Sequence, residues 1–340
     1  MEENRTLFGM DFAALAQTPL TLELAQKVVG ALQTALYKDR PINSFAPLHS
    51  AFCGVRENGE FAITEVRYGD VYPNSFLDFI YPNGDTKFLR PTVVFLHGGG
   101  YFSGEKSSGD PLAVGNPDVT ILHEIVAHGY NLVNMDYCLM PEGKFPIPLL
   151  QLDEALRFCL THAEQYHLDM TRVILMGGSA GAILTTQYGT LLANAEYQQL
   201  LGMHPCIDHA AVKALIVDDA PLMPEHFSWA LKVMLGNYCG TVDVTASVFR
   251  QYNPYPYFNE LMTPCFFDAG TIDGFPQDMR ACSEKLTALG VENELYLPNT
   301  PQNHGFVSQA AENPVAAECF SQILAFMDCH TGHAASKPSS

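Results

Sequence analysis

The segment Gly177-Gly178-Ser179-Ala180-Gly181 restricts the fold of this chain more than any other feature of the sequence. It directly follows the apolar run 172–176 and precedes a helical pattern that begins at Ala182. A serine between glycines, in a turn from a strand to a helix, is typical of a nucleophile elbow. The serine backbone is strained there, and flanking glycines avoid clashes. The context therefore predicts a strand, a tight turn that exposes the Ser179 hydroxyl, and a helix.

The rest of the chain repeats this alternation of elements. From about residue 60 onward, short apolar runs alternate with longer helical patterns, which is typical of a mostly parallel sheet covered by helices. We therefore expect an α/β fold in a chain whose 340 residues allow one large domain. The expected strands are 77–80, 92–96, 131–137, 173–176, 214–217, 265–267 and 294–297, and the expected helices are 121–127, 150–163, 183–195, 279–289 and 316–327.

A second glycine motif, His97-Gly98-Gly99-Gly100, follows the apolar run 91–96. Its backbone N–H groups are not covered by side chains, which suits an anion site. In acyl transfer the substrate carbonyl becomes an oxyanion, and each preorganised N–H donor stabilises it by roughly 3 to 4 kcal/mol. We predict that Gly99, Gly100 and Ala180 donate to this oxyanion and that His97 is structural.

A serine nucleophile needs a histidine base, and the base needs an acid partner. Where the serine lies on an elbow, the acid and then the histidine follow it in the chain. His304 lies in a loop after a late strand pattern and is the best base. Asp273 lies in the loop 270–274, after the strand pattern 265–267, and is the favoured acid. The rivals are Asp268, Asp278, Asp218 and Asp219.

The charge of the chain limits its partners. Eighteen basic and thirty-seven acidic residues give a net charge of −19, which repels nucleic acid and anionic membrane surfaces. We expect no nucleic-acid and no membrane partner, and a homo-oligomer remains open. The first twenty residues lack a secretion signal, and nine scattered cysteines fit reduced thiols, so we expect a cytoplasmic protein.

No cofactor or metal is expected. The sequence has no glycine-rich phosphate loop with a lysine, so a nucleotide cofactor is not implied. His204, Cys206 and His209 could ligate a metal, but a fourth ligand at a sensible spacing is missing.

Four motifs in this order resemble the hormone-sensitive-lipase-like group of α/β-hydrolases, with its bacterial carboxylesterases. HGGG is followed about eighty residues later by GxSAG, and later by an Asp and by His304-Gly305-Phe306. Asp136-Tyr137-Cys138-Leu139-Met140-Pro141-Glu142 is similar to the group's DYRLAPE segment. The resemblance implies an α/β-hydrolase fold, a mostly parallel central sheet flanked by helices, with a helical N-terminal cap, and it supports Ser179, Asp273 and His304 as the triad.

The resemblance also suggests a division of the chain. Residues 1–50 contain an apolar stripe at helical spacing (Leu24, Val28, Leu32, Leu36) and could supply the cap, which is either a lid or ordinary surface packing. Residues 51–330 would form the catalytic domain. Within it, 221–262 is rich in aromatic residues and could wall a pocket, while the small polar residues 331–340 suggest a disordered tail.

Two positions depart from the group's pattern. Gly178 stands where the group usually has Asp, and Cys138 stands where it usually has Arg. We hypothesise that the two charges are partners in the typical enzyme and were lost here as a pair, because one alone would be uncompensated.

These features together predict a serine carboxylesterase that takes small-molecule esters of short acyl chains and works through an acyl-enzyme. Two alternatives stay open. The same triad can serve an amidase or formamidase, and a non-catalytic α/β-hydrolase could bind a ligand in the same pocket.

Overall fold

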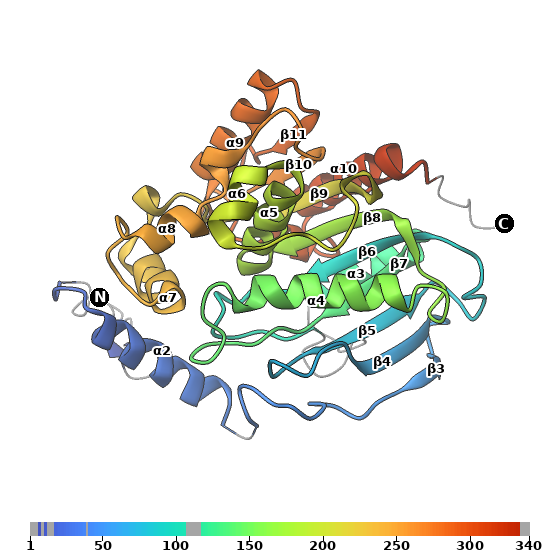
Figure 1. Ribbon diagram of the computed structural model, residues 1–340, viewed down its shortest axis with the longest axis horizontal. Helices are drawn as coiled ribbons and strands as arrows, with labels where there is room; N and C mark the ends of the chain where they lie inside the picture. Colours follow the sequence, from blue (N-terminus) through green and yellow to red (C-terminus); the bar gives the residue numbers. More distant parts are fainter. Residues whose placement is uncertain (1–5, 8–9, 12–16, 39, 107–116, 334–340) are drawn as a thin grey trace.

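The computed structural model describes residues 6–7, 10–11, 17–38, 40–106 and 117–333. Its centre is a nine-stranded sheet in the order β11-β10-β9-β8-β6-β7-β5-β4-β3 (Figure 1). The strands from β6 to β11 pair in parallel, and β3, β4 and β5 add an antiparallel edge next to β7. This mostly parallel sheet confirms the predicted α/β class.

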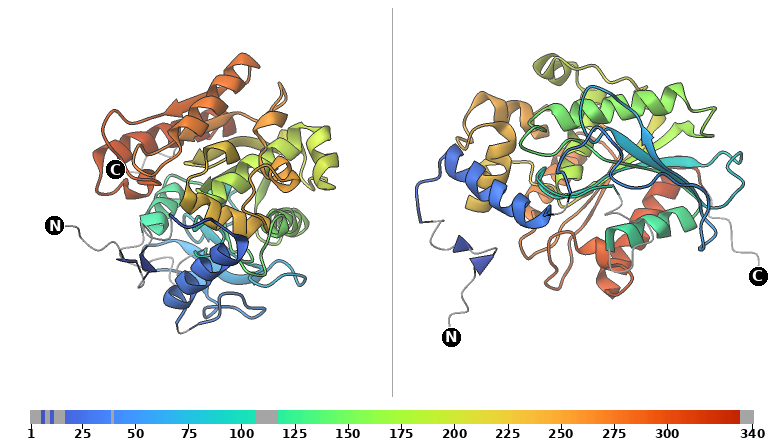
Figure 2. Two further views of the ribbon diagram at one scale, coloured as in Figure 1. Left: turned by 90° about the vertical axis from the view of Figure 1, so that its left-hand side faces the viewer. Right: turned by 90° about the horizontal axis from the view of Figure 1, so that it is seen from below.

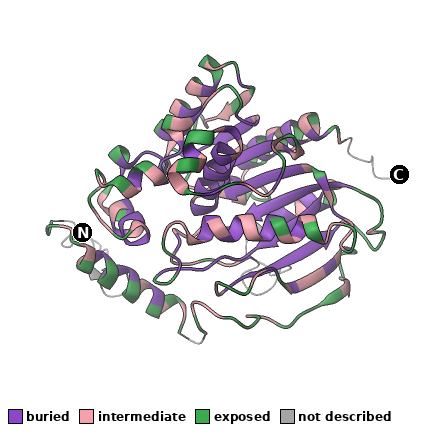
Figure 3. Cartoon of the chain, in the orientation of Figure 1, coloured by how far each residue is buried: buried purple, intermediate pink, exposed green. Residues whose placement is uncertain are grey.

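The strands of this sheet follow the apolar runs of the sequence. The bounds are β3 (Cys53–Val55), β4 (Phe61–Arg67), β5 (Phe76–Tyr81), β6 (Pro91–Leu96), β7 (Asn131–Met135), β8 (Asp169–Gly178), β9 (Val212–Asp218), β10 (Cys265–Asp268) and β11 (Asn293–Tyr296). Every residue of β5, β6, β7 and β10 is buried, as expected for strands covered on both faces (Figure 3). β3 and β4 have no such continuous run, and the sequence reading missed them. A separate two-stranded sheet pairs β1 (Thr6–Leu7) with β2 (Met10–Asp11).

Helices cover both faces of the sheet. One apolar cluster joins alternate strand residues to α4 (Ile147–Thr161), α5 (Ala180–Ala193) and α9 (Pro276–Ala288). The residues between them pack on α3 (Pro117–Ala127) and α10 (Pro314–Thr331). All five predicted helices are present. The last one, α10, extends through Thr331, so the tail predicted for residues 331–340 begins later than expected. Its remaining residues, 334–340, lie outside the described part of the chain.

The N-terminal segment and the aromatic-rich segment meet at one end of the molecule. The predicted apolar stripe forms α2 (Leu22–Leu36), capped by the Thr21 side chain, which accepts from the Leu24 N–H. It packs on α7 (Trp229–Cys239), which belongs to the aromatic-rich segment together with α8 (Ser247–Tyr252) (Figures 1 and 2). Between α5 and β9 lies the short α6 (Ala195–Leu201). No helix in the described part of the chain is long and apolar enough to cross a bilayer.

Candidate active site

Ser179 lies in a strained turn at the carboxyl end of β8. Its φ and ψ are 53° and −111°, and α5 begins at the next residue. A side chain at Gly181 would collide with the Leu96 carbonyl, and one at Gly177 would collide with the Gly181 backbone. The two glycines are therefore required by the close approach of β6, β8 and α5, as the motif predicts.

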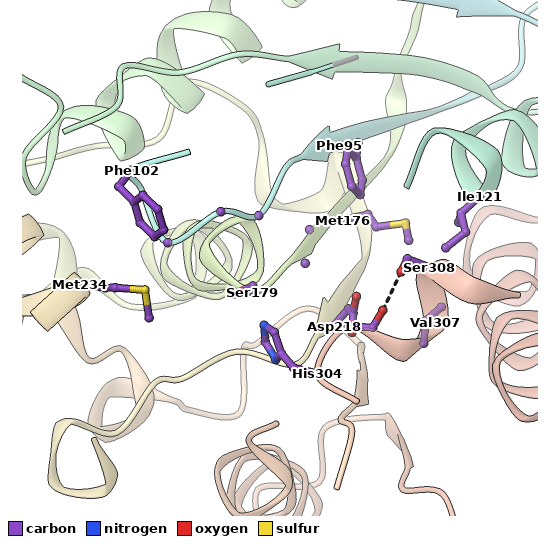
Figure 4. Close-up of a pocket in the computed structure, with 16 residues that line it drawn as sticks. Phe95, Phe102, Ile121, Met176, Ser179, Asp218, Met234, His304, Val307 and Ser308 are labelled. Carbon is purple, nitrogen blue, oxygen red and sulfur yellow. Dashed lines mark hydrogen bonds between the residues drawn. The ribbon is translucent and has the colours of Figure 1, made fainter. Parts of the chain in front are cut away.

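His304 faces the same pocket as Ser179, from the loop after β11 (Figure 4). Its Nδ1 atom lies 3.0 Å from Oδ2 of Asp219, directly after β9. Burial lowers the pKa of His304, but the adjacent carboxylate of Asp219 and the negative charges of Asp218 and Asp273 outweigh burial. The pKa of His304 is therefore raised above its usual value of 6.5.

The carboxylate of Asp219 is surrounded by hydrogen-bond donors. It is fully buried and has a φ of 58°, a strained backbone for a non-glycine residue. Its Oδ2 accepts from the N–H of Gly270 at 3.0 Å and of Gly305 at 3.2 Å, and its Oδ1 accepts from the N–H of Phe275 at 2.6 Å. Three backbone donors and one imidazole fix both carboxylate oxygens of Asp219.

Asp273, the favoured acid of the sequence reading, is exposed, and no contact with His304 is described for it. Its loop has another role in the structure, because Gly270 and Phe275 from this loop are two of the donors to Asp219. Ile272 pairs with Asn303, and the Ile272 carbonyl accepts from the His304 N–H at 2.9 Å. The geometry therefore brings the rival Asp219 to His304. Placement in the sequence and the family resemblance together favour Asp273, in the loop after β10, over Asp219 at the end of β9.

The HGGG loop lines the pocket beside Ser179. Gly98, Gly99 and Gly100 are all among the lining residues. Gly99 has a φ of 101°, and its carbonyl accepts from the N–H groups of Phe102 and Ser103, so this turn needs glycine. The Tyr101 hydroxyl donates to the Ala180 carbonyl at 3.0 Å, which ties the loop to the first turn of α5. The three predicted N–H donors thus come from two segments held against each other.

His97 is structural, as its surroundings indicate. Its ring stacks on Tyr137 at a centroid distance of 4.1 Å, and its Nδ1 lies 2.7 Å from the Gly98 carbonyl oxygen. The Tyr137 hydroxyl donates to the His97 carbonyl at 2.7 Å. The start of the HGGG loop is therefore fixed by its own neighbours.

The far end of the same loop is anchored by a buried group of charges, which we call the Lys106 cluster. The Lys106 ammonium is fully buried, contacts Glu65, and lies 3.5 Å from Asp78 and 3.6 Å from Asp136. Burial lowers the pKa of Lys106, but the three carboxylates outweigh burial and raise it. Burial also raises the pKa of Asp78 to about 6. One cation thus holds three elements, β4, β5 and the end of β7, to the loop.

The N-terminal helix also contacts this loop. Buried Gln33 of α2 donates to the carbonyls of Phe102, at 2.9 Å, and Met140, at 2.6 Å. Arg40 pairs with Glu105, and Nε2 of His49 lies 3.0 Å from the same carboxylate. Residues of the predicted cap therefore fix the backbone of Phe102, which lines the pocket.

The pocket has a volume of about 390 Å³ and extends to two sides of Ser179 and His304 (Figure 4). Phe102 and Met234 of α7 close one side, which we call the Met234 side. The other side, which we call the Asp218 side, is lined by Asp218 together with Phe95, Ile121, Met176, Val307 and Ser308. No group of three or more His, Cys, Asp or Glu side chains suited to a metal ion occurs among the described residues.

Comparison with known proteins finds carboxylesterases and esterases among the similar proteins. Carboxylesterase NlhH of Mycobacterium tuberculosis is 27% identical over 243 residues, covering 69% of this chain and 72% of the relative. The crystal structure of esterase B from Lactobacillus rhamnosis superposes with a TM-score of 0.69 and 21% identity, covering 94% of this chain and 96% of that protein. Esterase LipW from Mycobacterium marinum gives a TM-score of 0.61 at 20% identity, covering 90% and 87%. At these identities the solved structures establish the fold alone.

The family comparison reaches further, because it covers more than half of the chain. The model described as BD-FAE matches residues 77–275, from β5 to the loop that surrounds Asp219. The predicted α/β-hydrolase fold is confirmed, and the chain belongs to the BD-FAE family.

Proposed function

We propose that this protein hydrolyses carboxylic esters of small molecules through an acyl-enzyme on Ser179. The observation that carries the proposal is the geometry of one pocket, in which an elbow serine and a histidine lie together and the histidine Nδ1 is 3.0 Å from a buried carboxylate. The carboxylesterase and esterase names of the relatives support the same reaction.

In the proposed reaction Ser179 Oγ attacks the ester carbonyl carbon while His304 takes the hydroxyl proton. His304 then gives this proton to the departing alcohol oxygen, which leaves as the C–O bond breaks. Water attacks the acyl-enzyme with His304 again as base, and the acid product leaves as Ser179 recovers its proton. The N–H groups of Gly99, Gly100 and Ala180 stabilise the oxyanion in both halves.

We assign the acid to Asp219 instead of Asp273. Asp219 orients the His304 ring through Nδ1 and stabilises the imidazolium, while three backbone N–H groups keep its own charge in place. Asp273 is exposed, and within the described part of the chain its carboxylate accepts no such backbone hydrogen bonds. It acts on His304 only through its charge.

The substrate preference we propose is for short acyl chains. Phe102 and the Met234 sulfur lie close to Gly100, within 3.1 to 3.2 Å of where a Cβ at this residue would be. The Met234 side of the pocket is therefore closed a short distance from the proposed oxyanion site. The aromatic-rich segment supplies Met234, and α2 braces Phe102, so these two parts of the chain would act together as the cap.

The test is hydrolysis of p-nitrophenyl esters graded from acetyl to palmitoyl, by the wild type and by Ser179→Ala. We expect activity on the short esters that the substitution abolishes. Activity that survives in Ser179→Ala would refute the nucleophile. A wild type inert on every ester but labelled at Ser179 by a fluorophosphonate would favour an amide substrate, and a protein that resists the probe would favour a binding role.

A further inference from the structure

The Asp218 side of the pocket carries an acidic residue that the proposed triad does not use. Asp218 is the last residue of β9, and it lines the pocket beside Ser308 (Figure 4). Its backbone carbonyl accepts from the Ser179 N–H at 2.8 Å. Its carboxylate lies above the residue before the nucleophile, because a Cβ on Gly178 would be 3.2 Å from Oδ2 of Asp218. A charge on Asp218 therefore acts on whatever occupies this side of the pocket.

A second carboxyl group stands directly behind Asp218. Asp268 ends β10, and the sheet register pairs its Cα with that of Asp218. Asp268 is fully buried, and the ion pairs described for the chain do not include it. The charges acting on it are those of Asp218 and Asp219, both negative. Burial and these charges raise the pKa of Asp268 well above its usual range.

Two carboxyl groups this close cannot both ionise in a buried place, so the pair keeps one proton and one negative charge. Asp268 holds the proton because it is the more deeply buried of the two. The negative charge then stays on Asp218, at the pocket wall.

We propose that the Asp218–Asp268 pair determines which substrate charges the pocket accepts: esters that carry a carboxylate or phosphate on the Asp218 side are rejected, and neutral or cationic ones are accepted. The inference rests on the proposed ester hydrolysis. The same charge repels the carboxylate product once it has lost its proton, which would favour its release.

The test uses two sets of esters matched in size. In the first set the acyl group of a p-nitrophenyl ester is butyryl (neutral), succinyl (anionic) or 4-aminobutyryl (cationic). In the second set the acyl group is always butyryl, and the phenol carries a para carboxamide, carboxylate or aminomethyl group. The set that responds identifies which part of the substrate lies beside Asp218. The wild type should prefer neutral and cationic members of that set.

The variants are Asp218→Asn and Asp268→Asn, with Asp70→Asn as a charge control, since the Asp70 side chain is 83% exposed on the surface. Asp218→Asn should raise the kcat/KM ratio of anionic to neutral ester by on the order of tenfold or more, as a nearby charge in a partly buried site requires. Asp268→Asn should leave this ratio near wild type, because an amide replaces a neutral acid. An infrared band of a protonated carboxylic acid at neutral pH should disappear in Asp268→Asn.

Several outcomes would overturn the inference. A wild type that hydrolyses anionic and neutral members of both sets equally well rejects it without any variant, even if Asp218→Asn fails to fold. Equal shifts in Asp218→Asn and Asp70→Asn, or a tenfold shift in Asp268→Asn, reject it as well. Inactivity on neutral esters overturns the proposed function and the inference with it, whereas activity on them without charge discrimination overturns the inference alone.

Discussion

Among the described residues, the buried carboxylates of the Lys106 cluster and those beside Ser179 are balanced in different ways. The Lys106 cluster sets three carboxylates around one fully buried ammonium. Beside Ser179, Asp219 is stabilised by three backbone N–H groups and His304, whereas the charges that act on the buried Asp268 are those of Asp218 and Asp219, both negative.

A carboxylate that supports the fold and a carboxylate that acts on a catalytic base need different partners. A cation such as Lys106, whose pKa is raised by the carboxylates around it, keeps its charge and fixes the loop it belongs to. A carboxylate that must act on an imidazole proton cannot be paired with such a cation without losing its effect on that proton. Backbone N–H groups are donors that hold the charge without neutralising it.

Asp219→Asn tests the role of the carboxylate beside His304, and it should have the largest effect of the variants on activity. The amide oxygen can still accept from the backbone, but the ring of His304 loses its anionic partner, so kcat/KM should fall by about 10⁴-fold. The pKa of His304 should also fall, which moves the acid limb of the pH profile of kcat/KM to lower pH. Asp273→Asn is the matched control and should change kcat/KM only a few-fold. The reverse order would return the acid role to Asp273.

Lys106→Met tests how much the Lys106 cluster contributes to the stability of the fold. Removing the ammonium leaves buried carboxylates uncompensated, which should lower the free energy of unfolding by about 3–5 kcal/mol. Urea unfolding followed by circular dichroism measures this, with the exposed Lys87→Met as control. A loss equal to that of the control would mean that the cluster does not depend on its cation.

Gly178→Asp adds a carboxylate beside the carboxylate of Asp218. The new side chain would begin 3.2 Å from Oδ2 of Asp218, so like charges should cost about 1–3 kcal/mol of stability. Gly178→Ala separates the charge from the added volume, and only the excess of Asp over Ala counts. A Gly178→Asp variant more stable than the wild type would contradict this, and would also contradict the idea that the usual Asp and Arg were lost as partners.

Asp78→Asn should have the smallest effect, and its sign depends on pH. The pKa of Asp78 is raised to about 6 from 3.8, so the folded state binds the proton more tightly than the unfolded state. The wild type therefore loses stability as pH rises from about 4 to about 6, and charged Asp78 costs stability above this range. Asn removes that part of the pH dependence. Thermal unfolding at pH 4, 6 and 8 should show a flatter curve for the variant, and an unchanged curve would exclude Asp78 as its source.

Much of the fold could be predicted from the sequence because its signals are local. Strands buried on both faces are continuous apolar runs, and the elbow glycines are required by contacts between adjacent elements. The edge strands β3 and β4 were missed because half-exposed antiparallel strands have weaker patterns.

The acid could not be chosen from local signals. Asp219 and Asp273 both follow strands that end at the same edge of the sheet, and chain order fits either one. The choice depends on where the loop 270–275 folds, because it turns its backbone N–H groups toward Asp219 and leaves Asp273 exposed. Such long-range donors leave no trace in the spacing of residues.

The backbone hydrogen bonds at the ends of β8, β9 and β10 link the proposed nucleophile, Ser179, and the proposed acid, Asp219, into one ladder. The Ser179 N–H donates to the Asp218 carbonyl at 2.8 Å, and the Asp219 N–H donates to the Asp268 carbonyl at 2.9 Å. Amides in the centre of a sheet exchange with solvent only when large cooperative units open. The amide protons of Ser179 and Asp219 should therefore exchange together with the central strands. Partial unfolding that spares the central strands would then leave Ser179 and Asp219 in place. Enzymatic activity would still be lost once the loop that carries His304, after the edge strand β11, detaches from the sheet.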